Sequence, residues 1–166
     1  LGITVWIIGS SIIRDVFYYI SDKNLGLGNI GIDIIWDFHP GMTSDHILYT
    51  VQQLLAHNSP PCMLILYCGG NDLGQVRVGY LQYSLKHVIQ TLSHWLPTCR
   101  IIWSAVLPRL SFPYECNHSK LEKAWRRLNT EISKLYINLG GGFIRYPQIK
   151  ESQEYFRDFD LTLCHL

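Results

Sequence analysis

The chain has 166 residues, of which 48% are hydrophobic and 16% are charged. This length fits one domain of ordinary size, and the composition supports a buried core and excludes a disordered or low-complexity chain. The formal net charge is +1, so there is no basic excess to bind a phosphate backbone. We therefore expect no nucleic-acid binding by this segment.

Short apolar, β-branched stretches alternate with longer amphipathic stretches along the chain. The short stretches predict strands, and the long ones predict helices because their apolar residues recur every three to four positions. In chain order we predict strand 3–8, helix 11–21, loop 25–31, strand 32–36, a helix capped by Thr43 or Ser44 and stopped by 58–61, strand 63–67, helix 81–96, strand 100–106, loop 107–118, helix 119–139 and strand 143–146.

This alternation of strands and helices is typical of α/β proteins. It predicts a three-layer α/β/α architecture with a five-stranded parallel sheet in flavodoxin-like order. No internal repeat or linker divides the sequence, so we expect residues 1–166 to form a single domain. The sequence does not begin with Met and starts almost directly with a strand. We interpret it as a segment of a longer protein.

The turns after the predicted strands carry the candidate functional residues, because ligands of open parallel sheets bind beyond the carboxyl ends of the strands. These turns are 9–11, 39–42, 68–72 and 107–109, together with the C-terminal stretch that holds His165. A serine at the start of a helix is either a cap or a nucleophile. The Gly-Gly-Asn-Asp segment at 69–72 is either an ordinary turn or a place where an Asn amide donates to a developing oxyanion. For Asp72 we predict capping or holding of the turn.

Four blocks in order resemble those of the SGNH hydrolases, also called GDSL-type esterases: Gly9-Ser10-Ser11-Ile12, Gly41, Gly69-Gly70-Asn71-Asp72 and His165. The segments VWIIGSS, CGGNDLG and WSAVLPR are similar to SGNH hydrolase-type esterase domains of vertebrate proteins, many from fish and amphibians and some linked to mobile elements. The resemblance covers nearly the whole chain. It implies hydrolysis of carboxylic esters with short acyl or acetyl groups through an acyl-serine intermediate, and it implies no cofactor and no metal.

By this resemblance Ser11, rather than Ser10, is the nucleophile, since the family pattern is Gly-x-Ser-hydrophobic. The amides of Ser11 and Gly41 and the side chain of Asn71 form the oxyanion hole, and His165 is the base that a serine hydroxyl requires. The place of Ser11 agrees with this role, because the first turn of a helix favours negative charge.

The sequence departs from the family pattern next to the histidine. The family acid lies three residues before it, where this sequence has Thr162, and Asp160 lies five residues before it. If the loop bulges, Asp160 orients the imidazole. If it does not, a dyad is left, and loss of the acid from such a triad lowers turnover by about 10⁴. Two interpretations therefore stay open: a serine esterase that acts on a small-molecule ester, and a catalytically weakened domain of the same fold that acts as a binding module. The absence of the closing C-terminal helix usual in such domains also favours the second.

Further patterns bear on metals, membranes and compartment. The cysteines form no Cys-x-x-Cys pair and the histidines no HxH or HxxxH pair, so we expect no metal site. The odd number of cysteines favours a reducing, intracellular compartment. No apolar run approaches the ~20 residues of a membrane span, and no signal peptide is visible. His39 either lines the pocket or is an ordinary surface residue, and Arg109 contacts either an anionic substrate or a structural partner.

Overall fold

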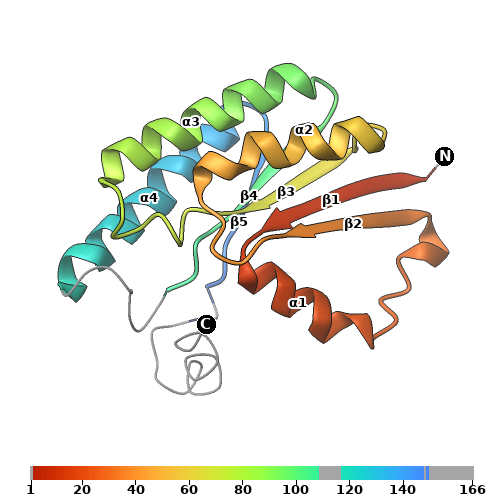
Figure 1. The fold of residues 1–166 in the computed structure, drawn as a ribbon, viewed down its shortest axis with the longest axis horizontal. Helices are drawn as coiled ribbons and strands as arrows, with labels where there is room; N and C mark the ends of the chain where they lie inside the picture. Colours follow the sequence, from red (N-terminus) through yellow and green to blue (C-terminus); the bar gives the residue numbers. More distant parts are fainter. Residues whose placement is uncertain (1, 109–116, 148, 150–166) are drawn as a thin grey trace.

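The computed structural model describes residues 2–108, 117–147 and 149. Its centre is a parallel sheet of five strands in the order β2-β1-β3-β4-β5 (Figure 1). The strands are β1 (Ile3–Gly9), β2 (Ile32–Phe38), β3 (Met63–Tyr67), β4 (Arg100–Ser104) and β5 (Gly142–Ile144). The predicted α/β class and flavodoxin-like strand order are therefore confirmed.

Four α-helices and two short 3₁₀ helices connect these strands within the described ranges. They are α1 (Ser11–Ser21), η1 (Gly28–Ile30), η2 (Ser44–His46), α2 (Ile47–His57), α3 (Val78–Trp95) and α4 (His118–Asn138). The bounds of α1 and β3 match the prediction, whereas the predicted loop 25–31 contains η1. Helix α3 begins earlier than predicted, because the partly buried Val78 already packs against the core. None of the helices in these ranges combines the length and apolarity needed to cross a membrane.

Four strands end at other residues than predicted: β1 ends at Gly9, β2 at Phe38, β4 at Ser104 and β5 at Ile144. For β2 and β4, contacts with distant residues explain the difference. Strand β2 continues to Phe38, which pairs with Gly9 and whose ring centroid lies 5.4 Å from that of Phe17. Strand β4 ends at Ser104, because both the N–H and the carbonyl group of Val106 are hydrogen-bonded to the side chain of Asn129. The Val106 N–H donates to Asn129 Oδ1 at 3.0 Å, and the Val106 carbonyl accepts from Asn129 Nδ2 at 3.0 Å.

The helices cover the two faces of the sheet unequally (Figure 1). Helix α1 lies on one face, where the ring of Phe17 packs against Trp36 and Phe38 of β2 at centroid distances of 5.7 and 5.4 Å. Helices α2, α3 and α4 lie on the opposite face. The chain that leaves β1 therefore runs to one face, and the chain that leaves β3 runs to the other. In open α/β sheets such a divergence between adjacent strands marks the place where ligands bind.

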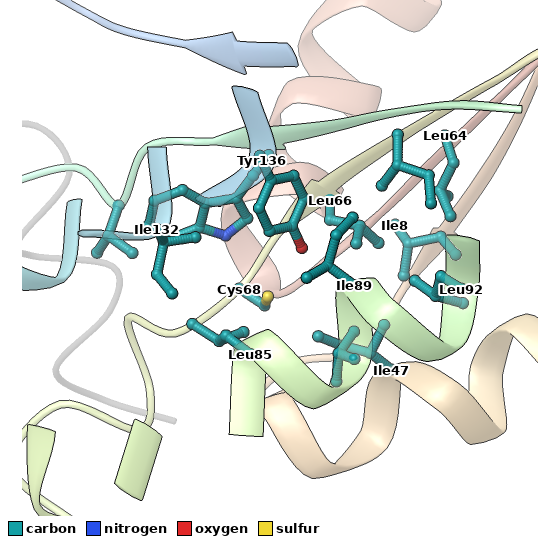
Figure 2. Packing of buried hydrophobic residues seen from close by; sticks show 14 of the residues in the cluster. Ile8, Ile47, Leu64, Leu66, Cys68, Leu85, Ile89, Leu92, Ile132 and Tyr136 are labelled. Carbon is teal, nitrogen blue, oxygen red and sulfur yellow. The ribbon is translucent and has the colours of Figure 1, made fainter. Parts of the chain in front are cut away.

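The larger hydrophobic core fills the space between the sheet and α2–α4. Figure 2 shows side chains of β1 and β3 packed against those of the three helices. The residues labelled there are Ile8, Ile47, Leu64, Leu66, Cys68, Leu85, Ile89, Leu92, Ile132 and Tyr136. Full burial of one aliphatic side chain stabilises a fold by about 1.5–3 kcal/mol. This layer thus holds β1 and β3 rigidly up to the turns that follow them.

Candidate active site

Three turns meet at one edge of the sheet, because the strands before them end in register. Gly9 pairs with Phe38 of β2 on one side and with Tyr67 of β3 on the other. The residues after β1, after β2 and after β3 are therefore neighbours, although they come from distant parts of the sequence. The predicted candidates Ser11, Gly41 and Asn71 lie in these three turns.

The first turn carries two serines in different surroundings. Ser10 is 2% exposed and occupies the N-cap position of α1, yet its side chain makes no capping hydrogen bond. Ser11 is the first residue of the helix and is partly exposed. Amides in the first turn of a helix have no partner within the helix, and the helix dipole favours an anion there. Of the two hydroxyls, that of Ser11 is thus both the more accessible and the one placed at the helix N-terminus.

Gly9 allows this abrupt change from strand to helix. A Cβ on Gly9 would lie 2.4 Å from Cγ1 of Ile13 and 2.8 Å from the carbonyl oxygen of Tyr67. Only a residue without a side chain lets α1 and β3 approach the end of β1 so closely. The position of Ser11 over the sheet edge is therefore set by backbone packing.

The second turn follows β2 and is held to the first. The amide of His39 donates to the carbonyl of Gly9 at 3.0 Å, and the amide of Met42 donates to the carbonyl of His39 at 3.0 Å. Pro40 and Gly41 fill the two central positions, and Gly41 has a φ of 76°. Proline followed by a residue with positive φ is the pattern of a type II turn, which explains why glycine stands here.

His39 makes a polar contact that the sequence does not reveal. Its Nε2 lies 2.7 Å from Oδ1 of Asp37, and its side chain is 61% exposed. Asp37, near the end of the edge strand β2, thus holds the His39 ring. Its lining of a substrate pocket stays a prediction.

The third turn follows β3 and binds the second turn at two points. Asn71 donates from Nδ2 to the carbonyl of Met42 at 3.0 Å. The carboxylate of Asp72 accepts the amide of Ser44 at 3.1 Å with each oxygen, and Oδ1 also accepts the Ser44 hydroxyl at 2.8 Å. We predicted that Asp72 caps or holds its own turn; its side chain instead binds Ser44, the first residue of η2, in the neighbouring turn. Sequence reasoning missed this partnership, since it treated Ser44 only as a possible cap of the following helix.

Burial raises the pKa values of two ionisable side chains in the third turn, Cys68 and Asp72. Burial raises the pKa of the Asp72 carboxyl above its ordinary value of 3.8, the hydrogen bonds from Ser44 oppose this rise, and the charge of Asp45 adds to it. Burial also raises the pKa of the Cys68 thiol, and the charge of Asp72 raises it further. Cys68 is therefore a protonated thiol at neutral pH and serves as a small core residue.

The other predicted residues are not placed at this edge by the structure. His165, Asp160 and Arg109 lie outside the described residues. Within the part of the chain that is described, no group of three or more His, Cys, Asp or Glu side chains could hold a metal ion. A cavity of about 250 Å³ lies between α1, the segment 23–28 and β2, and none of the candidate residues lines it.

Comparison with known proteins gives the fold. The sequence matches no family model and no curated protein. It is similar in structure to a GDSL-like lipase from Bacteroides thetaiotaomicron, with a TM-score of 0.71 and 19% identity over 87% of this chain and 69% of that one. It is also similar to an extracellular lipase from Streptomyces rimosus (TM-score 0.57, 13% identity, 86% of this chain and 79% of that one). A mutant of the esterase AlinE4 matches over 99% of this chain and 96% of its own, with a TM-score of 0.63 and 13% identity.

At these identities the likeness shows the fold alone. The parallel α/β fold of this chain is the one that GDSL-like lipases and esterases adopt.

Proposed function

We propose that this chain is a serine esterase that hydrolyses carboxylic esters with short acyl or acetyl groups through an acyl-serine intermediate. The observation that carries the proposal is the partly exposed Ser11 at the start of α1, beside two turns that are hydrogen-bonded to each other through Asn71 and Met42. The fold shared with lipases and esterases supports it. The closer likeness to vertebrate and mobile-element-linked domains stays a prediction from the sequence.

In the proposed reaction Oγ of Ser11 attacks the acyl carbon while its proton passes to the imidazole of His165. The tetrahedral oxyanion accepts hydrogen bonds from the amides of Ser11 and Gly41 and from Nδ2 of Asn71. The carbon–oxygen bond to the alcohol then breaks, and His165 returns the proton to the leaving alkoxide. A water molecule, deprotonated by His165, then attacks the acyl carbon. The bond between that carbon and Oγ of Ser11 breaks, His165 returns the proton to Oγ, and the carboxylic acid leaves.

The acid of the catalytic system is the second part of the proposal. His165 comes from the resemblance, and Asp160 is the carboxylate proposed to orient it; both lie outside the described residues. Without an orienting carboxylate a serine–histidine pair retains its geometry but turns over about 10⁴ times more slowly. Asp160→Asn therefore lowers the turnover number strongly if Asp160 holds the imidazole, and leaves it unchanged if the pair acts alone.

The test is the turnover of p-nitrophenyl acetate and butyrate by the wild type, Ser11→Ala and Ser10→Ala. Ser10 is the matched control, because it is the neighbouring hydroxyl and makes no capping bond. We expect Ser11→Ala to fall to the uncatalysed rate and to lose labelling by a fluorophosphonate probe, while Ser10→Ala keeps both. Equal turnover by Ser11→Ala and the wild type would disprove the esterase proposal. A folded wild type that neither turns over nor labels would favour the binding module.

A further inference from the structure

A buried polar network joins the turns after β2 and β3 to helix α3. The side chain of Asp72 is in a residue that is 4% exposed, and it accepts three hydrogen bonds from Ser44, which is 28 positions away in the sequence and 1% exposed. The hydroxyl of Ser84 on α3 donates to the hydroxyl of Ser44 at 3.2 Å. The buried hydroxyl of Ser44 thus connects the turn after β2 with the turn after β3 and with helix α3.

The third turn is hydrogen-bonded to the second turn at two positions. Two consecutive residues, Asn71 and Asp72, bind Met42 and Ser44 of the neighbouring turn. Within the third turn, Gln75 donates from Nε2 to the carbonyl of Asn71 at 2.8 Å. The network therefore joins the proline–glycine turn after β2 to the turn after β3.

Gly41 needs this support more than its neighbours do. It is exposed, and a Cβ built on it would find no atom within 4 Å. No side-chain packing therefore fixes its main chain, and glycine has more backbone freedom to lose than any other residue. The Asn71 bond to the adjacent Met42 and the Asp72 bonds to Ser44 therefore add to the main-chain bonds of His39 and Met42 that form the turn.

We propose that Asp72 is a positioning residue that, through Ser44, clamps the turn after β2 onto the turn after β3. The clamp keeps the main-chain amide of Gly41 and the side-chain amide of Asn71 at the spacing that an oxyanion requires. This inference rests on the proposed function. An oxyanion hole accelerates a reaction only when its donors are arranged in advance, and loss of one donor costs about 10²–10³ in turnover number. A displaced donor costs less, so loosening the clamp lowers kcat by about 10- to 100-fold.

The experiment compares Ser84→Ala, Ser44→Ala, Asp72→Asn and Asp72→Ala in the full chain. Ser84→Ala removes only the outermost bond, and Ser44→Ala removes the hydroxyl bonds but keeps the amide bond. Asp72→Asn retains one acceptor oxygen, and Asp72→Ala removes the clamp. We expect kcat to fall in that order, with Asp72→Asn partly rescued relative to Asp72→Ala and with KM nearly unchanged throughout.

Ser133→Ala is the matched control for a merely structural effect. Ser133 is also a serine that is 2% exposed, but its hydroxyl donates to the Thr130 carbonyl of its own helix at 2.9 Å, away from both turns. We expect this variant to lose stability without loss of kcat. If the Asp72 and Ser44 variants lower the melting temperature but keep kcat, as the control does, the positioning role is wrong.

Amide hydrogen exchange tests the clamp without any substrate. In the wild type the Ser44 amide should be protected, and its exchange should accelerate at least tenfold in Asp72→Ala while amides of β1 and β3 stay protected. Unchanged Ser44 exchange would overturn the clamp even in an active enzyme. If wild-type Ser11 proves unreactive, the proposed function fails and the catalytic role of Asp72 fails with it; accelerated exchange would then show that the clamp serves another use of this edge.

Discussion

Replacement of Gly9 by Ala tests whether close packing at the end of β1 sets the candidate site. The new methyl group would lie 2.4 Å from Cγ1 of Ile13 and 2.8 Å from the Tyr67 carbonyl oxygen. Comfortable contacts between such atoms are about 3.5–4.0 Å. Ile13 is 8% exposed and has little room to move, and the Tyr67 oxygen belongs to the backbone of β3. Both neighbours therefore resist the methyl group.

The expected cost follows from two opposing effects. Overpacking of a well-filled site costs about 1–3 kcal/mol. Gly-to-Ala replacement also restricts the unfolded chain, which returns about 0.4–1 kcal/mol. The net loss of about 1–2 kcal/mol lowers the melting temperature by about 2–8 °C for a chain of this length. Because the end of β1 must shift, the esterase turnover proposed for Ser11 should fall as well.

Urea unfolding and thermal melting measure this loss, with Gly79→Ala as the matched control. Gly79 lies in α3 with nothing within 4 Å of a built Cβ, so alanine there should stabilise the protein slightly through its higher helix propensity. In a double-mutant cycle, Gly9→Ala and Ile13→Ala should cost less together than the sum of their separate costs. A Gly9→Ala protein as stable as the wild type, or strictly additive costs, would show that this close approach does not exist.

Two further predictions concern buried polar groups. Burial raises the pKa of Asp72 above 3.8, so its ionisation opposes folding, and this penalty is absent below pH 3.8 and grows as the pH rises through the raised pKa. Urea titrations across this range should show Asp72→Asn gaining stability relative to the wild type as the pH rises; a constant difference would contradict the raised pKa. Asn129→Ala leaves the buried Val106 N–H without its acceptor and should cost about 1–3 kcal/mol in urea unfolding, whereas Asn129→Asp keeps that acceptor and should cost less. Equal losses in the two variants would show that the acceptor is unimportant.

The sequence predicts the elements of this fold well because each strand and helix has its own periodicity. Helix α1 and strand β3 keep their predicted bounds, since Gly9 and the proline pair before Cys62 interrupt the pattern sharply. The predicted bounds of β1, β2, β4 and β5 were wrong, and for β2 and β4 this is because distant residues decide where the strand ends. Phe17 extends β2 through its ring, and Asn129 ends β4 by binding the Val106 main chain. Neither partner is visible from the residues next to the strand ends.

In the candidate site, too, local sequence pattern predicts some features, whereas contacts between distant residues decide others. The sequence predicts that Ser11, Gly41 and Asn71 share one sheet edge, because the topology of a parallel sheet requires it. It does not predict how the turns are joined. Thr43 and Ser44 both look like caps of the next helix, yet only Thr43 caps η2 from its own chain position, while Ser44 reaches Asp72. A serine that caps a helix and a serine that bonds to another turn have the same neighbours in the sequence. Only the packing of α3 and of the turn after β3 around Ser44 distinguishes the two roles. The proposed oxyanion donors at this edge therefore depend on a contact between turns, and variants of Ser44 and Asp72 measure that contact.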